Sequence, residues 1–199
     1  MIKKIYMYKR FERFWHWAQA LLIFFLALTG FEVHGSYEIF GFKNAVVLHM
    51  YAGFMLIILI AFAIFWHFTT GEWRQYIPKT DKLRDQVRFY LVGIFKNESH
   101  PVEKTAEVKL NPLQRLTYLG YKILIIPVMV TTGLVYYYVA HGGIHLQSVK
   151  WIAILHTLGA FGLLSFTVIH VYMTTTGPRL TSHIKAMFTG YDEVEVKDK

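Results

Sequence analysis

The chain has 199 residues, a net charge of +8 and no cysteine, and 54% of its residues are hydrophobic while only 17% are charged. This hydrophobic share is too large for an ordinary soluble domain, and the lack of cysteine excludes disulfides, thiolate-bound iron–sulfur clusters, zinc fingers and covalently attached c-type haem. The basic charge could indicate nucleic-acid binding, but such proteins do not need long apolar runs. We therefore expect a protein embedded in membrane lipid, with no nucleic-acid partner.

Four apolar stretches are each long enough to cross a bilayer as a helix, which takes about 20 residues. They cover residues 15–34, 45–68, 116–140 and 151–176, and Pro127 should bend the third. The first is a retained helix rather than a signal peptide, because its apolar part is long and no A-x-A cleavage site follows. The sequence predicts an all-α membrane protein with one four-helix transmembrane domain over residues 1–190. We expect the charged tail, residues 191–199, to be disordered.

Lysine and arginine are distributed unevenly around these stretches. Eighteen lie before the first stretch, between the second and third, or after the fourth, and two, Lys43 and Lys150, lie in the short connections. The positive-inside rule then places both termini and residues 69–115 in the cytoplasm. Residues 81–95 carry apolar side chains at the spacing of one helical face, which predicts an amphipathic cytoplasmic helix on the membrane surface.

Four histidines lie inside or at the ends of the predicted spans, namely His16, His49, His156 and His170. His156 and His170 are 14 residues apart on one helix, which corresponds to a rise of about 21 Å on nearly the same face. With the N-terminus inside, His16 lies level with His170 at the inner end, and His49 lies level with His156 at the outer end. Each pair can supply both axial ligands of a haem iron, and irons ligated in this way carry electrons.

His67 is an alternative to His16, because it also lies at the cytoplasmic end and on the same face of its helix as His49. Pairing His49 and His67 with His156 and His170 would give spacings of about 27 Å and about 21 Å on the two helices. This mismatch favours His16. We assign no role to the remaining histidines, which are His34, His100, His141, His145 and His183.

Glycines and arginines near these histidines are further candidates. Gly53 and Gly159 follow His49 and His156 on the same helix faces, where a missing side chain would let a haem macrocycle pack closely. Membrane helices are rich in glycine in any case. Arg10 and Arg13 precede His16 and could pair with haem propionates, or they could simply belong to the basic cytoplasmic flank.

Six sequence strings, taken in order, resemble one family over almost the whole chain. They are RFERFWHWAQALLIFFLALTG, VVLHMYAG, NPLQRLTY, ILHTLGA, VIHVYMT and HIKAMFTGY. They are similar to the di-haem cytochrome b membrane subunits of respiratory formate dehydrogenases, nickel–iron hydrogenases and thiosulfate reductases. The resemblance implies that His16, His49, His156 and His170 ligate two b-type haems. It also implies that a quinone, menaquinone or ubiquinone, reacts beside the cytoplasmic haem near residues 111–114.

The NPLQ stretch also has a physical interpretation of its own. Asn111 stands in an N-cap position and Pro112 at the first position of a helix, where its missing N–H is not needed. Amide groups of Asn111 and Gln114 at the inner interface could hydrogen-bond the carbonyls of a quinone. Capping alone would also explain Asn111.

The resemblance therefore implies a membrane-anchoring di-haem cytochrome b subunit of a respiratory oxidoreductase, in the cytoplasmic (inner) membrane of a bacterium or archaeon. It would transfer electrons between the quinone pool and a partner on the outer face, an iron–sulfur or multihaem cytochrome c subunit that carries out the substrate chemistry. A stand-alone cytochrome b561-like quinone oxidoreductase, with the same helices and haems, is the alternative. A haem-free transporter or membrane anchor is a third class, and it would purify without colour.

Overall fold

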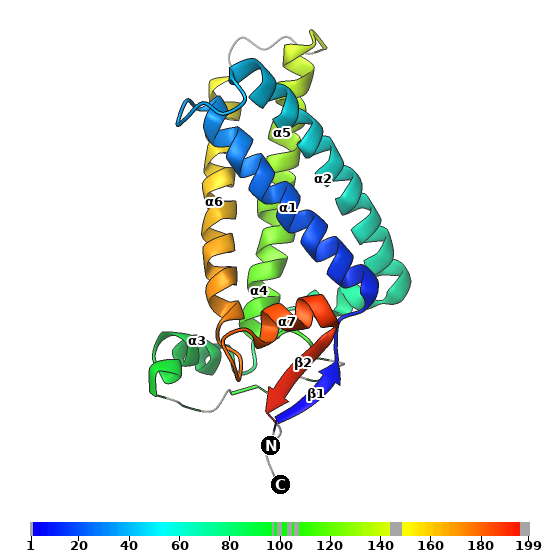
Figure 1. The fold of residues 1–199 in the computed structure, drawn as a ribbon, viewed down its shortest axis with the longest axis vertical. Coiled ribbons are helices and arrows are strands. Elements are labelled where there is room, and N and C mark those ends of the chain that lie inside the picture. The colour runs from blue at the N-terminus through cyan, green and yellow to red at the C-terminus, as the bar shows by residue number, and fades with distance from the viewer. Residues whose placement is uncertain are drawn as a thin grey trace. The chain divides into compact units, whose positions relative to one another are not determined.

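The computed structural model describes residues 2–96, 98, 101–102, 105, 108–143 and 149–195. Four helical segments dominate it, and Figure 1 labels them: α1 (Arg10–Val33), α2 (Phe42–Thr70), α4 (Pro112–Gly120) with its continuation α5 (Ile126–Ala140), and α6 (Lys150–Thr174). Each is long and apolar enough to cross a membrane. The prediction of an all-α membrane protein with four spans is thus confirmed. The first three spans extend beyond the predicted stretches because polar residues at their ends continue the helix.

The π-helical turn Tyr121–Ile125 joins α4 to α5 immediately before Pro127. A proline inside a helix lacks an N–H and its ring clashes with the carbonyl four residues earlier. A wider π turn at this place accommodates both defects. The irregularity expected at Pro127 therefore occurs in the turn that precedes it.

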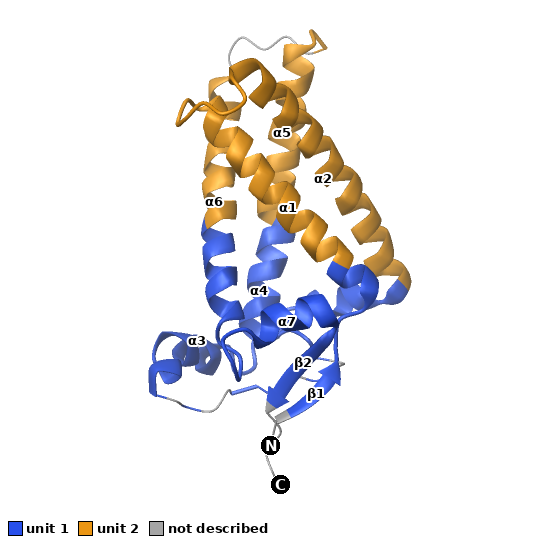
Figure 2. Ribbon diagram, in the orientation of Figure 1, with its two compact units in different colours: residues 1–13, 70–123, 165–199 blue, residues 14–69, 124–164 orange. Residues whose placement is uncertain are grey.

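Two compact units make up the chain (Figure 2). The first comprises Met1–Arg13, Thr70–Ile123 and Ser165–Lys199, and the second comprises Phe14–Thr69 and Leu124–Leu164. In the second unit most buried positions are small or polar, as at Thr29, Ala45, Ala52, Ala63 and Thr132, while large apolar side chains such as Phe62 and Leu158 are exposed. Small buried residues and exposed apolar ones are typical of membrane helices, which pack closely on one another and face lipid elsewhere.

Glu32 near the end of α1 holds the connection to α2. Its Oε1 accepts hydrogen bonds from the backbone N–H groups of Ile39, Phe40 and Gly41 at 2.9, 2.6 and 2.7 Å. These groups lie at the start of α2, where an anion is favoured by the helix dipole. Glu32 is 3% exposed. The contact fixes the start of α2 relative to the last turn of α1, and so fixes which residues of α1 face His49.

The chain ends pair with each other in the first unit. The strand β1 (Ile2–Tyr6) runs antiparallel to β2 (Tyr191–Glu195), with Tyr6 opposite Tyr191. The expectation of a disordered tail is therefore wrong for residues 191–195, and residues 196–199 lie outside the described part. Gly190, with φ 90°, makes the turn into β2, and a side chain there would meet the Tyr6 ring at 2.7 Å.

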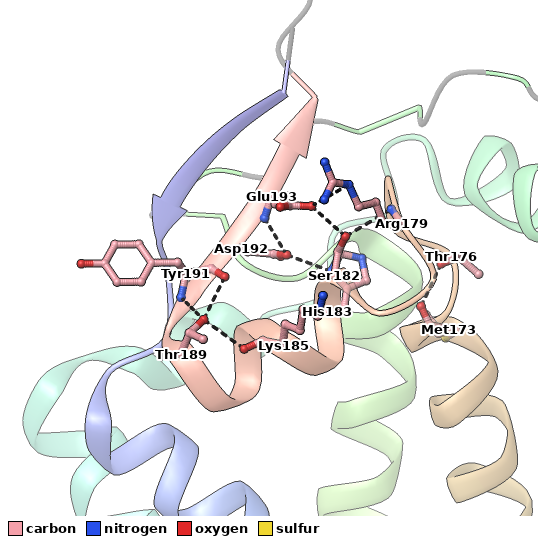
Figure 3. Close-up of polar contacts among 10 residues, drawn as sticks. All are labelled: Met173, Thr176, Arg179, Ser182, His183, Lys185, Thr189, Tyr191, Asp192 and Glu193. Atoms are coloured by element: carbon pink, nitrogen blue, oxygen red, sulfur yellow. Dashed lines mark hydrogen bonds and ion pairs between the residues drawn. The ribbon is translucent and has the colours of Figure 1, made fainter.

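Polar contacts explain why this charged tail is folded (Figure 3). Asp192 is fully buried, and its Oδ1 lies 3.0 Å from Nδ1 of His183 on α7 (Ser182–Thr189). Ser182 Oγ donates to Glu193 at 3.1 Å, and Arg179 lies 3.8 Å from the same carboxylate. Composition predicted a solvated tail, but these partners in the preceding segment hydrogen-bond or pair with its carboxylates. His183, which had no role assigned from the sequence, is one of these partners.

A buried ionic cluster joins three further segments of the first unit. Lys109 Nζ lies 2.7 Å from Glu12 Oε1 at the start of α1 and 3.0 Å from Glu72 Oε2 in the short 3-10 helix Glu72–Tyr76. Lys9 Nζ lies 2.9 Å from the other oxygen of Glu72. Burial by itself raises the pKa of Glu72, but the hydrogen bonds from Lys9 and Lys109 outweigh it and hold this pKa below its ordinary value. The cluster fixes the chain immediately before α4.

The helix predicted within residues 81–95 is present as α3 (Leu83–Leu91), followed by a 3-10 turn at Gly93–Lys96. Gln86, Phe89 and Tyr90 are its buried residues, whereas Leu91 is 69% exposed. One face thus packs within the first unit and another is open. Contact of the open face with a membrane surface stays a prediction. His100 and His145 lie outside the described residues.

Candidate haem-binding site

His49 on α2 and His156 on α6 face each other in the second unit. Their ring centroids are 6.3 Å apart, with the ring planes at 67°. This is the pair that the sequence placed at the outer end. At this separation and angle the rings make an edge-to-face pair, with one ring from each helix.

In each of these two histidines, a threonine hydroxyl lies within hydrogen-bond distance of Nδ1. Thr29 Oγ1 on α1 lies 2.9 Å from Nδ1 of His49, and Thr132 Oγ1 on α5 lies 2.8 Å from Nδ1 of His156. Both hydroxyls donate their single hydrogen to a backbone carbonyl, Phe25 O at 2.9 Å and Val128 O at 2.6 Å. A tautomer with the proton on Nδ1 satisfies both bonds at once and leaves a lone pair on each Nε2.

The residues present fit a haem iron between these rings. Two metal–imidazole bonds of about 2 Å each place the coordinating nitrogens about 4 Å apart, and the two ring radii account for the rest of the centroid distance. A Cβ built at Gly30 would lie 3.3 Å from His49 Cε1, so a side chain there would displace the ring by a few tenths of an ångström. A Cβ at Gly53 would meet nothing within 4 Å, which leaves space on α2 one turn after His49.

Gly159, the other glycine suggested for haem packing, has a different neighbour. A Cβ on this residue would lie 2.7 Å from Met129 Sδ of α5 and 3.4 Å from a methyl carbon of Val128. Close approach of two membrane helices at a small residue explains this glycine. A contact of Gly159 with a macrocycle stays a prediction.

The two members of the predicted inner pair lie in different units, His16 in the second and His170 in the first. Tyr118 of α4 places its hydroxyl 3.1 Å from Nδ1 of His170, and the ring of Phe166 stacks on His170 at 5.9 Å with a 9° angle between planes. His170 thus also has its Nδ1 engaged by a hydroxyl. The pairing of His16 with His170 stays a prediction from the sequence.

His67, the alternative to His16, is 8% exposed and packs among aromatic rings. Trp15 and Trp66 each approach its ring edge-on at 5.2 Å, and its Nδ1 lies 2.6 Å from the carbonyl of Ala63. These contacts account for the burial of His67. The ring of His16 lies 5.1 Å from that of Trp17, and the choice of His16 over His67 stays a prediction.

Asn111 and Gln114 form a capping box at the start of α4. Asn111 Oδ1 accepts from the Gln114 N–H at 2.8 Å, Gln114 Oε1 accepts from the Asn111 N–H at 3.1 Å, and Asn111 Nδ2 donates to the Tyr90 hydroxyl at 2.9 Å. Burial raises the pKa of Tyr90 above its ordinary value, so its phenol stays protonated. The predicted N-cap is therefore confirmed, and contact with a quinone stays a prediction.

The two arginines proposed for propionates differ in their surroundings. Arg10 is exposed at the start of α1. Arg13 Nη1 donates to the carbonyl of Phe188 on α7, while Nε of Arg13 is buried without a hydrogen-bond partner among the described residues. A buried guanidinium nitrogen is costly without an acceptor. Arg13 therefore fits a propionate better than Arg10 does.

Sequence reasoning missed four polar residues of the spans. Lys122 lies in the π turn of the third span, where its Nζ is 3.1 Å from the centre of the Tyr76 ring. A lysine inside an apolar stretch is itself a signal, because such residues are rare in membranes. Thr29, Thr132 and Tyr118 gave a weaker signal, since hydroxyl residues in membrane helices are common and only the fold shows which of them meet a histidine.

Residues 7–190 match the family model described as prokaryotic cytochrome b561. The chain belongs to this family. It is 32% identical over 198 residues to a protein of Escherichia coli (strain K12) named "Putative cytochrome YdhU", covering 95% of this chain and 75% of that protein. It is 25% identical over 214 residues to the "Probable Ni/Fe-hydrogenase B-type cytochrome subunit" of Rhodobacter capsulatus, covering 94% and 80% of the two chains. The protein is therefore a cytochrome b of the electron-transfer class, embedded in a membrane, and its family implies haem b.

Proposed function

We propose that this chain is the membrane-anchoring di-haem cytochrome b subunit of a respiratory oxidoreductase complex. It passes electrons between a redox partner on the outer face and the quinone pool. The observation that carries the proposal is the opposed pair His49 and His156, each with its Nδ1 within hydrogen-bond distance of a threonine hydroxyl. The tautomer with the proton on Nδ1 leaves the Nε2 lone pair for a haem iron. A haem held by two such imidazoles exchanges one electron at a time and has no open iron position for a substrate.

Four histidines hold the two haems in this proposal. His49 and His156 ligate the outer one, and His16 and His170 ligate the inner one. The Arg13 guanidinium, with Arg10 as a more exposed neighbour, neutralises propionate charge at the cytoplasmic end. The open space at Gly53 lies on the helix face of His49 and supports its place beside the outer macrocycle.

The quinone binds at the cytoplasmic end in this proposal, near Asn111 and Gln114. Both side chains are buried and hold each other in the capping box, so they fix the start of α4 two turns before Tyr118 and its partner His170. Protons for quinone reduction come from the cytoplasm. Electrons that cross inward to a quinone with protons taken up inside build membrane potential, and the opposite flow dissipates it.

A partner subunit, either iron–sulfur or multihaem cytochrome c, reaches the outer haem across the short connections 35–44 and 141–150. The name of the Rhodobacter capsulatus relative, a hydrogenase cytochrome subunit, supports a redox enzyme as the partner. The description of the family as cytochrome b561 keeps the stand-alone quinone oxidoreductase as a second candidate. Mild-detergent purification from the native membrane separates the two, because a subunit purifies with its redox partner and a stand-alone enzyme purifies alone.

The decisive experiment is a reduced-minus-oxidised spectrum with haem quantification. We expect two non-covalent b haems per chain, and about half the absorbance in His49→Ala and in His170→Ala because each loses one haem. His141→Ala is the matched control, since this histidine is exposed at the outer end of α5 and should leave both haems in place. A preparation without haem contradicts the proposal. Loss of one haem from His67→Ala, with both retained in His16→Ala, contradicts the assignment on the first span.

A second experiment tests the quinone site. Changing Asn111 and Gln114 together to Ala should slow quinone turnover while both haems stay bound and reducible. Because loss of the cap also costs about 1 kcal/mol of stability, Asn111→Asp is the control variant, since Asp keeps the capping oxygen and lacks the amide N–H. Slow turnover in both variants supports amide contact with the quinone. Normal quinone turnover in both variants would contradict this assignment and place the quinone site elsewhere.

A further inference from the structure

The two outer histidines meet the same dipeptide on different helices. Thr29 and Gly30 of α1 face His49, and Thr132 and Gly133 of α5 face a second histidine, His156. In each case the threonine hydroxyl bonds Nδ1, and the following glycine lies against Cε1 of the same ring, with a built Cβ at 3.3 Å in the first case and 3.7 Å in the second. Helix α1 thus supplies both a hydroxyl partner and a flat surface for the ring of His49, and α5 supplies both for the ring of His156.

The bonds that the two hydroxyls make to backbone carbonyls suit them to accept from the rings. A threonine in a helix bonds the carbonyl one turn earlier, and here Thr29 donates to Phe25 O and Thr132 to Val128 O. Thr29 is fully buried and Thr132 is 5% exposed. Water therefore cannot readily replace either hydroxyl. An oxygen that donates to a carbonyl is polarised and becomes a better acceptor for the next bond in the chain.

We propose that Thr29 and Thr132 are positioning residues that set the tautomer, the ring orientation and the donor strength of His49 and His156. This inference rests on the proposed function, because it takes these histidines as the outer haem ligands. Accepting the Nδ1 proton fixes Nε2 as the coordinating nitrogen and raises its basicity. A more basic pair of imidazoles stabilises the oxidised iron. The outer haem then has a lower midpoint potential than it would have without the two hydroxyls.

Valine replaces threonine with nearly the same shape and no hydroxyl, so Thr29→Val and Thr132→Val remove the bonds with little change in packing. Loss of the partner of a metal-bound histidine typically costs about 10–100-fold in metal affinity or activity. A tenfold difference between the oxidised and the reduced iron corresponds to about 59 mV in a one-electron couple. We therefore expect redox titration of each variant to show the midpoint potential of the outer haem raised by roughly this amount, with the potential of the inner haem unchanged. Thr132→Ser should return the potential to the original value, because serine restores the hydroxyl.

Thr131→Val is the matched control. Thr131 neighbours Thr132, is exposed, and donates to Pro127 O at 2.7 Å, so the variant loses the same kind of helix bond without touching a histidine. Loss of the outer haem from Thr132→Val, with retention in Thr131→Val and Thr132→Ser, also supports the inference. Unchanged potentials in both histidine-facing variants overturn it, and so does an equal shift in Thr131→Val. Failure of the proposed function gives a different result, since the unaltered protein then lacks haem or His49→Ala retains both haems.

Discussion

Replacing Lys109 by methionine removes one cation from the middle of a buried ionic cluster. The Lys109 side chain is 8% exposed, and its two partners, Glu12 and Glu72, are 12% and 13% exposed. Methionine keeps the length of the side chain and lacks the charge, so two carboxylates lose the donor that solvated them. Removing one partner of a buried ion pair costs about 3–5 kcal/mol. Because both carboxylates keep some contact with solvent, we expect the free energy of unfolding to fall by about 3 kcal/mol, the lower end of this range.

Lys9→Met is the matched control for this prediction. Lys9 also lies 2.9 Å from Glu72, but its side chain is 53% exposed. An exposed pair contributes about 0–1 kcal/mol, so the control should lose far less stability. Adding Glu12→Gln to Lys109→Met should recover part of the loss, because one of the stranded charges is then gone.

The assay is the free energy of unfolding in mixed micelles, followed by tryptophan emission as denaturing detergent is added. Hydrogen exchange then locates the effect, which should fall on the segments that the cluster joins: the start of α1, the turn after α2 and the residues before α4. Equal losses in Lys109→Met and Lys9→Met would refute the reasoning, because burial would then not govern the cost. So would a double variant less stable than Lys109→Met alone.

Three further predictions concern the same protein. Tyr118→Phe removes the hydroxyl 3.1 Å from His170 Nδ1. With His170 as a ligand of the inner haem, as proposed, a redox titration should show a higher midpoint potential for that haem and an unchanged one for the outer haem. A shift in the potential of the outer haem contradicts this prediction. The pKa of Glu72 lies below its ordinary value of 4.5. The contribution of Glu72 to the free energy of unfolding is therefore complete above pH 4.5 and is lost as the pH falls through the folded pKa. The free energy of unfolding should accordingly fall with acid in the unaltered protein and less steeply in Glu72→Gln, and parallel curves would contradict this. A reporter fused after Ser36 should report outside the cytoplasm, and a cytoplasmic signal would invert the electron path.

The sequence by itself determined the four spans and the histidine spacing on one helix. Apolar runs of this length have one stable form in lipid, because a helix satisfies its own backbone hydrogen bonds there. His156 and His170 share a face for the same reason, since a single helix fixes their separation and direction. The N-cap at Asn111 was equally local, because the capping box closes within four residues.

Only the tertiary structure decided which residues meet across helices. Thr29 and His49 are brought together by the connection that Glu32 holds, and Thr132 meets His156 from a neighbouring helix. No period in the sequence records such a pairing, because rotation of one helix against another depends on the packing of all of them. The folded C-terminal strand was missed for the same reason. A charged segment is predicted to be solvated by its composition, and only the fold supplies the partners that bury Asp192.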